Sequence, residues 1–269
     1  MGFYDQFYKY YDDIFTFSEK KQQFLLDQFS YLPAEASLLD IGCGTGTYAI
    51  NLQENGFDVV GIDLEPEMID HSREKAARRN MEIEPRFKIL DMQDLDVFYS
   101  PHSFSGVYSL GNVLVHLADE DEIYTVIRKI YRILLSSGKI VVQIVNYDRI
   151  LSRGITELPT IENEDKGIKF ERKYHYDENR NKIKFNTRLE VENPLTEENN
   201  KNKNIGNKDI KDKQQVFRNS VELFPLQSQQ FVDMMEEAGF VNIDLHGSFS
   251  GEEYKPEESF HLIITAKKD

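Results

Sequence analysis

Residues 38–46 read LLDIGCGTG and join an apolar run to a segment of helical character. The run at 37–41 predicts a buried strand, and 47–55 predicts the helix that follows it. Between them lies a GxGxG loop made by Gly42, Gly44 and Gly46. Glycines let a backbone turn tightly and approach a ligand without a clash at Cβ. Because the N–H groups at the start of a helix suit a carboxylate or a phosphate, the loop predicts a ligand site, with a purely structural turn as the alternative.

Two acids frame this loop. Asp40 precedes it at the strand end, where a carboxylate can orient the loop or meet an ammonium group of the ligand. Asp63 ends the next strand, 17 residues beyond Gly46, and can accept both hydroxyls of a ribose there. Taken singly, each acid also fits a solvated strand end. The dinucleotide fingerprint requires GxGxxG, and here Thr47 follows a third glycine that comes one residue early, which disfavours an NAD-linked oxidoreductase.

Strands and helices alternate through the first half of the chain. Further strands are predicted at 58–62, 86–90, 106–110 and 139–145. Further helices are predicted at 66–80 and 121–135, the second with Gly138 after it as a stop signal. Such alternation is typical of a parallel, doubly wound α/β sheet.

After Asn146 the pattern becomes β-rich. Antiparallel strands are predicted at 168–176, 182–192 and 216–224, the first two joined by a hairpin turn at 177–181. The polar segment 193–215 predicts a mobile loop. The α/β pattern resumes with a helix at 228–238 and strands at 241–246 and 260–265. We therefore expect a core of residues 1–146 and 225–269 with an inserted β-rich lid at 147–224.

Composition narrows the possible partners. The net charge is −15, from 32 basic and 47 acidic residues, and no basic stripe relieves it, so nucleic acid is disfavoured and a small-molecule substrate is favoured. Cys43 is the single cysteine, so no intramolecular disulfide can form. No signal peptide or membrane span is evident, which predicts a cytoplasmic protein without membrane attachment. No metal-ligand spacing is present, and an oligomer remains possible.

Four segments together resemble the successive motifs of class I S-adenosylmethionine (SAM)-dependent methyltransferases: LLDIGCGTG, VVGIDLEPEMI, ILDMQDL and GVYSLGNVLVHL. The resemblance implies a Rossmann-like seven-stranded methyltransferase sheet and SAM as the cofactor. It implies that Asp63 holds the ribose and that Leu110 lies beside the methionine portion. Around the adenine it places Leu64, Met68, Asp91 and Met92. The remaining cofactor-binding positions are those of the loop and its preceding acid, Asp40, Gly42, Cys43, Gly44 and Gly46.

A closer resemblance links the chain to glycine and glycine/sarcosine N-methyltransferases. It rests on SLGNVLVHL at 109–117, NYDRIL at 146–151, LFPLQ at 223–227 and GSFSGEEYKPEESFHLI at 247–263. In that family an arginine precedes NYD and pairs with the carboxylate of the amino-acid substrate. Here the position is Val145, which cannot supply those donors, and Arg149 and Arg153 are candidate replacements.

The acceptor side offers four candidate catalytic residues. Asn112 and His116 would share a face if their segment were helical, and His116 is the candidate proton acceptor, with a structural histidine as the alternative. Tyr11 is selected among Tyr4, Tyr8, Tyr10 and Tyr11 because an N-terminal tyrosine segment closes over the cofactor in the family. Tyr147 follows the fifth strand and could line the acceptor pocket. Cys43 lacks a partner pattern for a catalytic thiol.

These observations favour a SAM-dependent methyltransferase acting on a small amine or amino-acid-like compound. The same features allow methylation of an amino sugar, a quinone precursor or a carboxylate, because an inserted lid gives any small acceptor a walled pocket. A non-catalytic SAM-binding protein is the third hypothesis.

Overall fold

The computed structural model describes residues 8–79, 86–192 and 214–269. A seven-stranded sheet with the strand order β10-β11-β5-β4-β1-β2-β3 forms the centre of the molecule. Its strands run parallel except β11, which is antiparallel to both of its neighbours. The strands are β1 Ser37–Ile41, β2 Asp58–Asp63, β3 Phe87–Ile89, β4 Phe104–Ser109, β5 Leu134–Val145, β10 Phe240–His246 and β11 His261–Lys268. This is the doubly wound Rossmann-like sheet that the sequence predicts.

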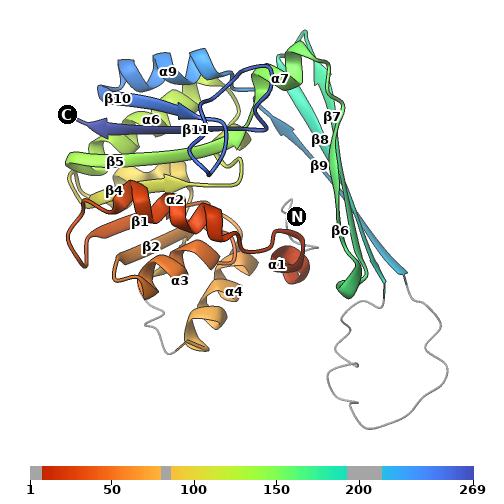
Figure 1. Cartoon of the computed structure of the whole chain (residues 1–269), viewed down its shortest axis with the longest axis horizontal. Coiled ribbons are helices and arrows are strands. Elements are labelled where there is room, and N and C mark those ends of the chain that lie inside the picture. Colours follow the sequence, from red (N-terminus) through yellow and green to blue (C-terminus); the bar gives the residue numbers. More distant parts are fainter. Residues whose placement is uncertain (1–7, 80–85, 193–213) are drawn as a thin grey trace.

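Helices cover both faces of this sheet (Figure 1). One face packs against α2 Glu19–Phe29, α3 Thr47–Glu54 and α4 Pro66–Ala77. The other packs against α5 Leu95–Phe98, α6 Glu120–Ile133 and α9 Ser228–Glu237. In α6 the buried side chains recur every three or four residues, so one continuous apolar stripe faces the strands.

A second, four-stranded antiparallel sheet stands beside the core (Figure 1). Its strands are β6 Glu157–Asn163, β7 Ile168–Asp177, β8 Lys182–Glu192 and β9 Gln214–Leu223, in that order. The short helix α7 Tyr147–Ser152 leads into it from β5. Three of these strands and the hairpin turn at 177–181 confirm the sequence prediction, whereas β6 was not predicted. Most of the polar segment 193–215 lies outside the described residues.

One boundary prediction was wrong. Gly138 does not stop α6, because the helix ends at Ile133 and β5 begins at the next residue. The pairing of β5 with β4 is irregular there: Leu134 is opposite Phe104, but Lys139 is opposite Gly106. The extra residues bulge out while the strand continues, so Gly138 lies within the strand.

The described N-terminal segment lies between the core and the second sheet (Figure 1). It forms η1 Tyr8–Tyr10 and α1 Tyr11–Ile14, and Tyr10 and Ile14 pack with residues of β7 and β8 in a small apolar cluster. Tyr4 lies outside the described residues. This segment therefore ties the second sheet to the core.

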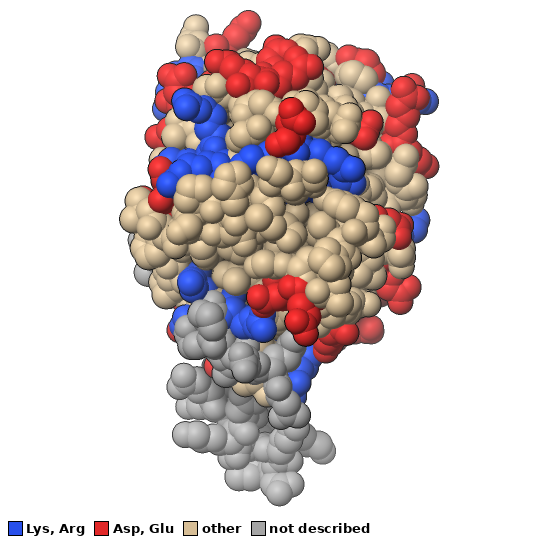
Figure 2. Space-filling view, turned by 90° about the vertical axis from the view of Figure 1, so that its left-hand side faces the viewer, with Lys and Arg blue, Asp and Glu red and all other residues tan. Residues whose placement is uncertain are grey.

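Figure 2 shows the side of the core that faces away from the second sheet. Uncharged residues form a broad belt across this face, with Lys and Arg side chains along its upper border. None of the helices in the described part of the chain has the length and apolar character needed to cross a membrane.

Candidate functional site

A cavity opens at the carboxyl ends of β1, β2 and β4, where the parallel strands point toward the second sheet (Figure 1). Its lining includes ten of the residues selected from the sequence: Tyr11, Gly42, Gly44, Asp63, Leu64, Met68, Asp91, Met92, Leu110 and His116. Asp40, Cys43, Gly46, Asn112 and Tyr147 are close by but do not line it. Open α/β sheets place their ligands at this edge, so the cavity is the candidate site.

The glycine loop makes the floor of the cavity. Gly42 and Gly46 have φ angles of +71° and +73°, in the left-handed region that favours glycine. A Cβ at Gly42 would lie 2.5 Å from the Val113 side chain, and one at Gly46 would lie 2.8 Å from the Phe87 ring. A side chain at either position would therefore displace its neighbours as well as strain the backbone.

Asp63 binds this loop to the end of β2. One carboxylate oxygen accepts a hydrogen bond from Gly44 N at 2.8 Å, and the other accepts one from Glu65 N at 3.0 Å. Each oxygen keeps a second lone pair for a ligand. The carboxylate is therefore held in one orientation at the cavity wall before any ligand binds.

Asp40 is buried beneath the loop, with 4% of its surface exposed. Burial, reinforced by the charge of Asp63, raises the pKa of Asp40 to about 8. A cationic group in the cavity would favour its charged form. Burial also raises the pKa of the Cys43 thiol well above its usual value, which keeps the thiol protonated and argues against a nucleophile.

The wall beyond Asp63 combines one acid with apolar side chains. Asp91 accepts a hydrogen bond from Gln93 N at 2.9 Å, which fixes its carboxylate at the start of the 3₁₀ turn η2 Met92–Asp94. Leu64 also lines the cavity, although 61% of its surface is exposed. A flat apolar ligand group would cover this exposed leucine.

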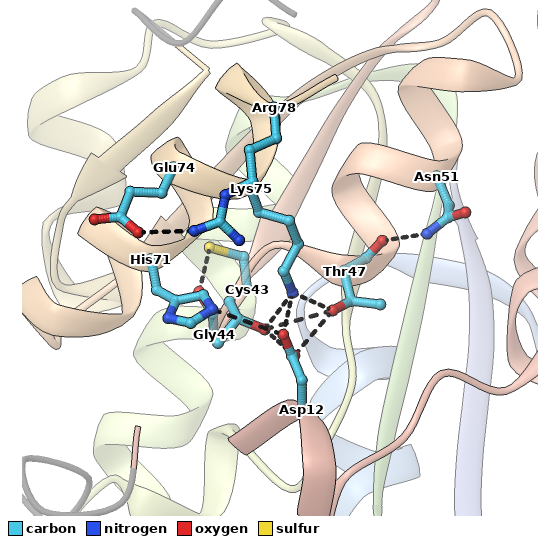
Figure 3. A network of polar contacts seen from close by, with 10 residues as sticks. Asp12, Cys43, Gly44, Thr47, Asn51, His71, Glu74, Lys75 and Arg78 are labelled. Atoms are coloured by element: carbon cyan, nitrogen blue, oxygen red, sulfur yellow. Dashed lines mark hydrogen bonds and ion pairs between the residues drawn. The ribbon is translucent and has the colours of Figure 1, made fainter. Parts of the chain in front are cut away.

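A polar network fastens α1 to the glycine loop (Figure 3). The Asp12 carboxylate forms an ion pair with Lys75 of α4 at 2.5 Å and accepts a hydrogen bond from the Thr45 hydroxyl at 2.5 Å. Lys75 also donates to Thr47 at 2.9 Å. Although burial alone would raise the pKa of Asp12, the hydrogen bonds from Lys75 and Thr45 hold it below its usual value. This network was not predicted from the sequence, because no local pattern connects residues so far apart in the chain.

The network places Tyr11 over the loop. Tyr11 lines the cavity next to Gly44, where a Cβ would lie 3.4 Å from the Tyr11 ring. The ring also packs against Phe15, with 4.9 Å between centroids. The aromatic ring therefore covers the loop from the N-terminal side.

Asn112 and Tyr147 are paired with each other. Asn112 is not helical: its φ is +73°, so the expectation that it shares a helix face with His116 was wrong. Its amide donates to the Tyr147 hydroxyl at 3.0 Å, and its oxygen accepts from Val145 N at 3.0 Å. Both residues therefore hold the ends of β4 and β5 together behind the cavity wall.

His116 ends the 3₁₀ turn η3 Leu114–His116 and lines the cavity. Burial lowers its pKa to about 4, so the imidazole is neutral at neutral pH. It can accept a hydrogen bond or orient a ligand, but it is a weak base.

Arg149 and Arg153, the candidate replacements for the arginine that is absent at Val145, make contacts away from the cavity. The Arg149 guanidinium lies over the Phe260 ring, 6.0 Å from its centroid, and Arg153 pairs with Glu257 at 3.5 Å. Neither lines the cavity.

Sequence comparison connects this geometry to a family. A model described as a methyltransferase domain matches residues 38–138, the stretch that carries the loop, both acids and η3. A glycine/sarcosine/dimethylglycine N-methyltransferase of Actinopolyspora halophila is 24% identical over 99% of this chain and 42% of its own length. Residues 38–138 of the chain therefore form a methyltransferase domain. A glycine/sarcosine N-methyltransferase of Aphanothece halophytica is 26% identical over 86% of this methyltransferase and 76% of that relative.

A solved structure extends the likeness over the whole fold. The SAM-bound amino pentose methyltransferase CalS10 from Micromonospora echinaspora has a TM-score of 0.68 and 17% identity, covering 100% of this methyltransferase and 99% of that chain. That solved structure is bound to SAM. The site fits this molecule, because it offers a pre-oriented acid for hydroxyl groups, an exposed apolar wall for a flat ring and a buried acid for a cation.

Proposed function

We propose that this methyltransferase transfers the methyl group of SAM to a small amine or amino-acid-like acceptor. The observation that carries the proposal is a neutral imidazole, His116, lining the same cavity as the loop and Asp63. A neutral acceptor of hydrogen bonds suits an amine, whose N–H groups it can bind. Both relatives are N-methyltransferases of glycine and sarcosine, which supports this class of acceptor.

Each part of the cofactor has candidate partners among the cavity residues. Asp63 would accept from the ribose hydroxyls, and Asp91 from the adenine amine, with Leu64, Met68 and Met92 against the ring. Leu110 and the loop glycines would contact the methionine portion. Asp40 would balance its positive charge from beneath the loop, with Cys43 packing beside it.

When bound, SAM supplies a methyl group activated by a positively charged sulfur. The residues of the protein then have to hold the acceptor nitrogen in line with that methyl group and keep water out. His116 would orient the amine through a hydrogen bond. With its pKa at about 4 it does not deprotonate an ammonium group efficiently, so the acceptor must enter as the free amine.

Three further residues would shape the acceptor side. Tyr11 would close the cavity over the loop from the N-terminal segment. Asn112 and Tyr147, hydrogen bonded to each other, would position the segment between β4 and η3. Asn112 and Tyr147 would act as positioning residues, because neither of them lines the cavity.

The second sheet would act as a lid over the acceptor. We assign residues 1–146 and 225–269 to the SAM-binding core and residues 147–224 to this lid. The side of the lid that packs on the core lies opposite the carboxyl ends of the parallel strands (Figure 1). A sheet in that position would form one wall of the acceptor pocket and exclude water from the pocket.

Two measurements test the proposal. Calorimetry should detect binding of SAM and S-adenosylhomocysteine and no binding of NAD. S-adenosylhomocysteine release, followed over a panel of amines, amino acids and amino sugars, should then identify an acceptor. SAM binding without turnover of any member of the panel would support a non-catalytic SAM-binding protein and contradict the proposal.

An amino sugar is the second candidate acceptor. The full-length likeness to an amino pentose methyltransferase favours it, since the lid sheet and the core align together. The same release assay separates the two classes: turnover of amino sugars alone selects this candidate, and turnover of small amines or amino acids alone selects the first.

A further inference from the structure

The inner face of the lid sheet, the face that packs on the core, is apolar at both ends. At one end Phe170 and Leu189 pack with α1, and Phe217 lies 6.0 Å from the Tyr10 ring, centroid to centroid. At the other end Tyr174 and Ile183 belong to the main core cluster. The inner face therefore bridges the N-terminal segment and the core.

A polar row crosses the middle of this face. Arg172 of β7 is opposite Thr187 of β8, and Thr187 is opposite Asn219 of β9. Residues directly opposite each other in antiparallel strands project from the same face of the sheet. Thr187 is 5% exposed, and Arg172 and Asn219 are half-buried, so the molecule covers the centre of the row and part of each flank.

Two nitrogen donors of this row are buried and have no hydrogen-bond partner in the described part of the chain: Arg172 Nε and Asn219 Nδ2. Arg172 Nη2 donates to the Pro159 carbonyl oxygen at 2.7 Å, but no acid of the described residues pairs with Arg172. Burial lowers the pKa of Arg172. Arg172 is half-buried, and a half-buried cation without a counter-ion among the described residues is destabilising. Both unfilled atoms are donors, so an anionic oxygen acceptor would satisfy them.

Arg188, on the opposite face of the same sheet, shows the contrast. Its guanidinium pairs with Glu171 at 3.3 Å and also with Glu190. Among the described residues, carboxylates therefore pair with Arg188 on the outer face of the sheet and none pairs with Arg172 on the inner face.

Arg172 is linked to the candidate site through tyrosines. Burial raises the pKa of both Tyr174 and Tyr147. The charge of Arg172 opposes the rise at Tyr174, and Tyr174 adds to the rise at Tyr147, so the three groups lie near one another. Tyr147 is hydrogen bonded to Asn112, the neighbour of Gly111 in the cavity wall. At the end of β9, Phe224 N donates to the Val115 carbonyl at 2.8 Å, next to His116. These contacts join the inner face that carries the polar row to the His116 side of the cavity, although the row itself does not line the cavity.

We propose that the methyl acceptor carries a carboxylate, and that the Arg172 row of the lid binds it, with the Arg172 guanidinium as the main partner and the Asn219 amide as a second donor. This deepens the proposed function and rests on it. The lid would then bind the carboxylate, because Val145 of the core has no hydrogen-bond donors in its side chain to do so. A carboxylate is the acceptor group whose geometry matches the guanidinium fork.

The test compares acceptors that differ only in the anion. Glycine and sarcosine are assayed beside glycinamide and sarcosinamide, by S-adenosylhomocysteine release, with wild type, Arg172→Gln, Arg172→Lys and Arg188→Gln. We expect Arg172→Gln to raise KM for the carboxylates about tenfold or more while leaving the carboxamides unchanged. Arg172→Lys should keep part of the carboxylate preference, and Arg188→Gln should keep all of it. Thermal melting and SAM affinity of each variant verify folding.

The results separate the two proposals. If wild type prefers the carboxamides, or if Arg172→Gln weakens both acceptor types equally, the lid site is wrong and methyl transfer to amines still stands. If no acceptor is turned over, glycine is titrated into the complex with S-adenosylhomocysteine. If wild type then binds glycine with measurable heat and Arg172→Gln does not, the lid site stands although the proposed reaction fails. If wild type shows no heat of binding, the lid site is wrong.

Discussion

At the residue scale, Asp63 shows how one side chain serves both the fold and the ligand. Its two oxygens already accept hydrogen bonds from Gly44 N and Glu65 N, so a ribose would find a carboxylate that needs no reordering. Asp63→Ala should weaken SAM binding by ~1–3 kcal/mol, measured by calorimetry. Asp70→Ala, whose side chain is 71% exposed on α4, is the control. If Asp63→Ala and wild type bind SAM with equal affinity, Asp63 does not bind the ribose.

The other acid of the motif predicts a pH effect. At a pH below the pKa of aspartate in the unfolded chain, Asp40 is protonated in both the folded and the unfolded protein. Between that pH and about 8, Asp40 is protonated only in the folded protein. The free energy of unfolding without SAM should therefore fall by about 1.4 kcal/mol per pH unit through this window from Asp40 alone, and level off above it.

Asp40→Asn should remove that one-proton slope, because an amide does not titrate. Urea unfolding at several values between about pH 5 and pH 8 measures the slope directly. The variant should also gain stability relative to wild type at the alkaline end while losing SAM affinity. A slope unchanged by the substitution would show that Asp40 is ionised in the folded protein.

At the element scale, the ion pair between Asp12 and Lys75 fastens α1 to the cofactor loop. Lys75→Met should reduce hydrogen-exchange protection of α1 and weaken SAM binding, because Tyr11 loses its support over Gly44. A double-mutant cycle with Asp12→Asn should give a coupling of roughly 0.5–3 kcal/mol in SAM affinity. Arg79→Met, which breaks an exposed ion pair with Glu54, should change neither quantity. Additive effects of the two substitutions would contradict a coupled network.

Elements differ in how well the sequence predicted them. The strand at Lys182–Glu192 and the hairpin turn before it were found because alternating apolar residues and a polar turn are local signals. The strand β6 Glu157–Asn163 was missed, since its residues are mostly exposed and its pairing with β7 carries an irregularity between Leu158 and Ile161. An edge strand of this kind has no period-two pattern to find.

At the scale of the whole molecule, the lid shares its apolar cluster with the core. Leu223 of β9 is fully buried with core residues, although it belongs to the lid sheet. Leu223→Ala should lower the free energy of unfolding by ~2–5 kcal/mol. Val97→Ala, at a residue 75% exposed, should stay close to wild type. Both are measured by urea unfolding, and a loss confined to the lid in hydrogen exchange would show that lid and core unfold separately.

The sequence alone determined the sheet, the GxGxG loop and the acids that frame it. These features follow from local requirements: glycines where φ is positive, apolar periods of a strand or helix, and an acid at a strand end. Gly42, Gly44 and Asp63 of the cavity lining were predicted for the same reason, whereas Leu64, Met68, Asp91, Met92, Leu110 and Tyr11 were predicted from the family resemblance.

Only the tertiary structure decided which distant side chains meet. It paired Asn112 with Tyr147, fastened Asp12 to Lys75, and left the buried Nε of Arg172 without a hydrogen-bond partner among the described residues. The partners in each pair come from segments whose separation along the chain hides their contact, and burial is set by the packing of the lid on the core. Motifs along the chain therefore predicted the cofactor, and the fold decided which distant side chains meet around its site.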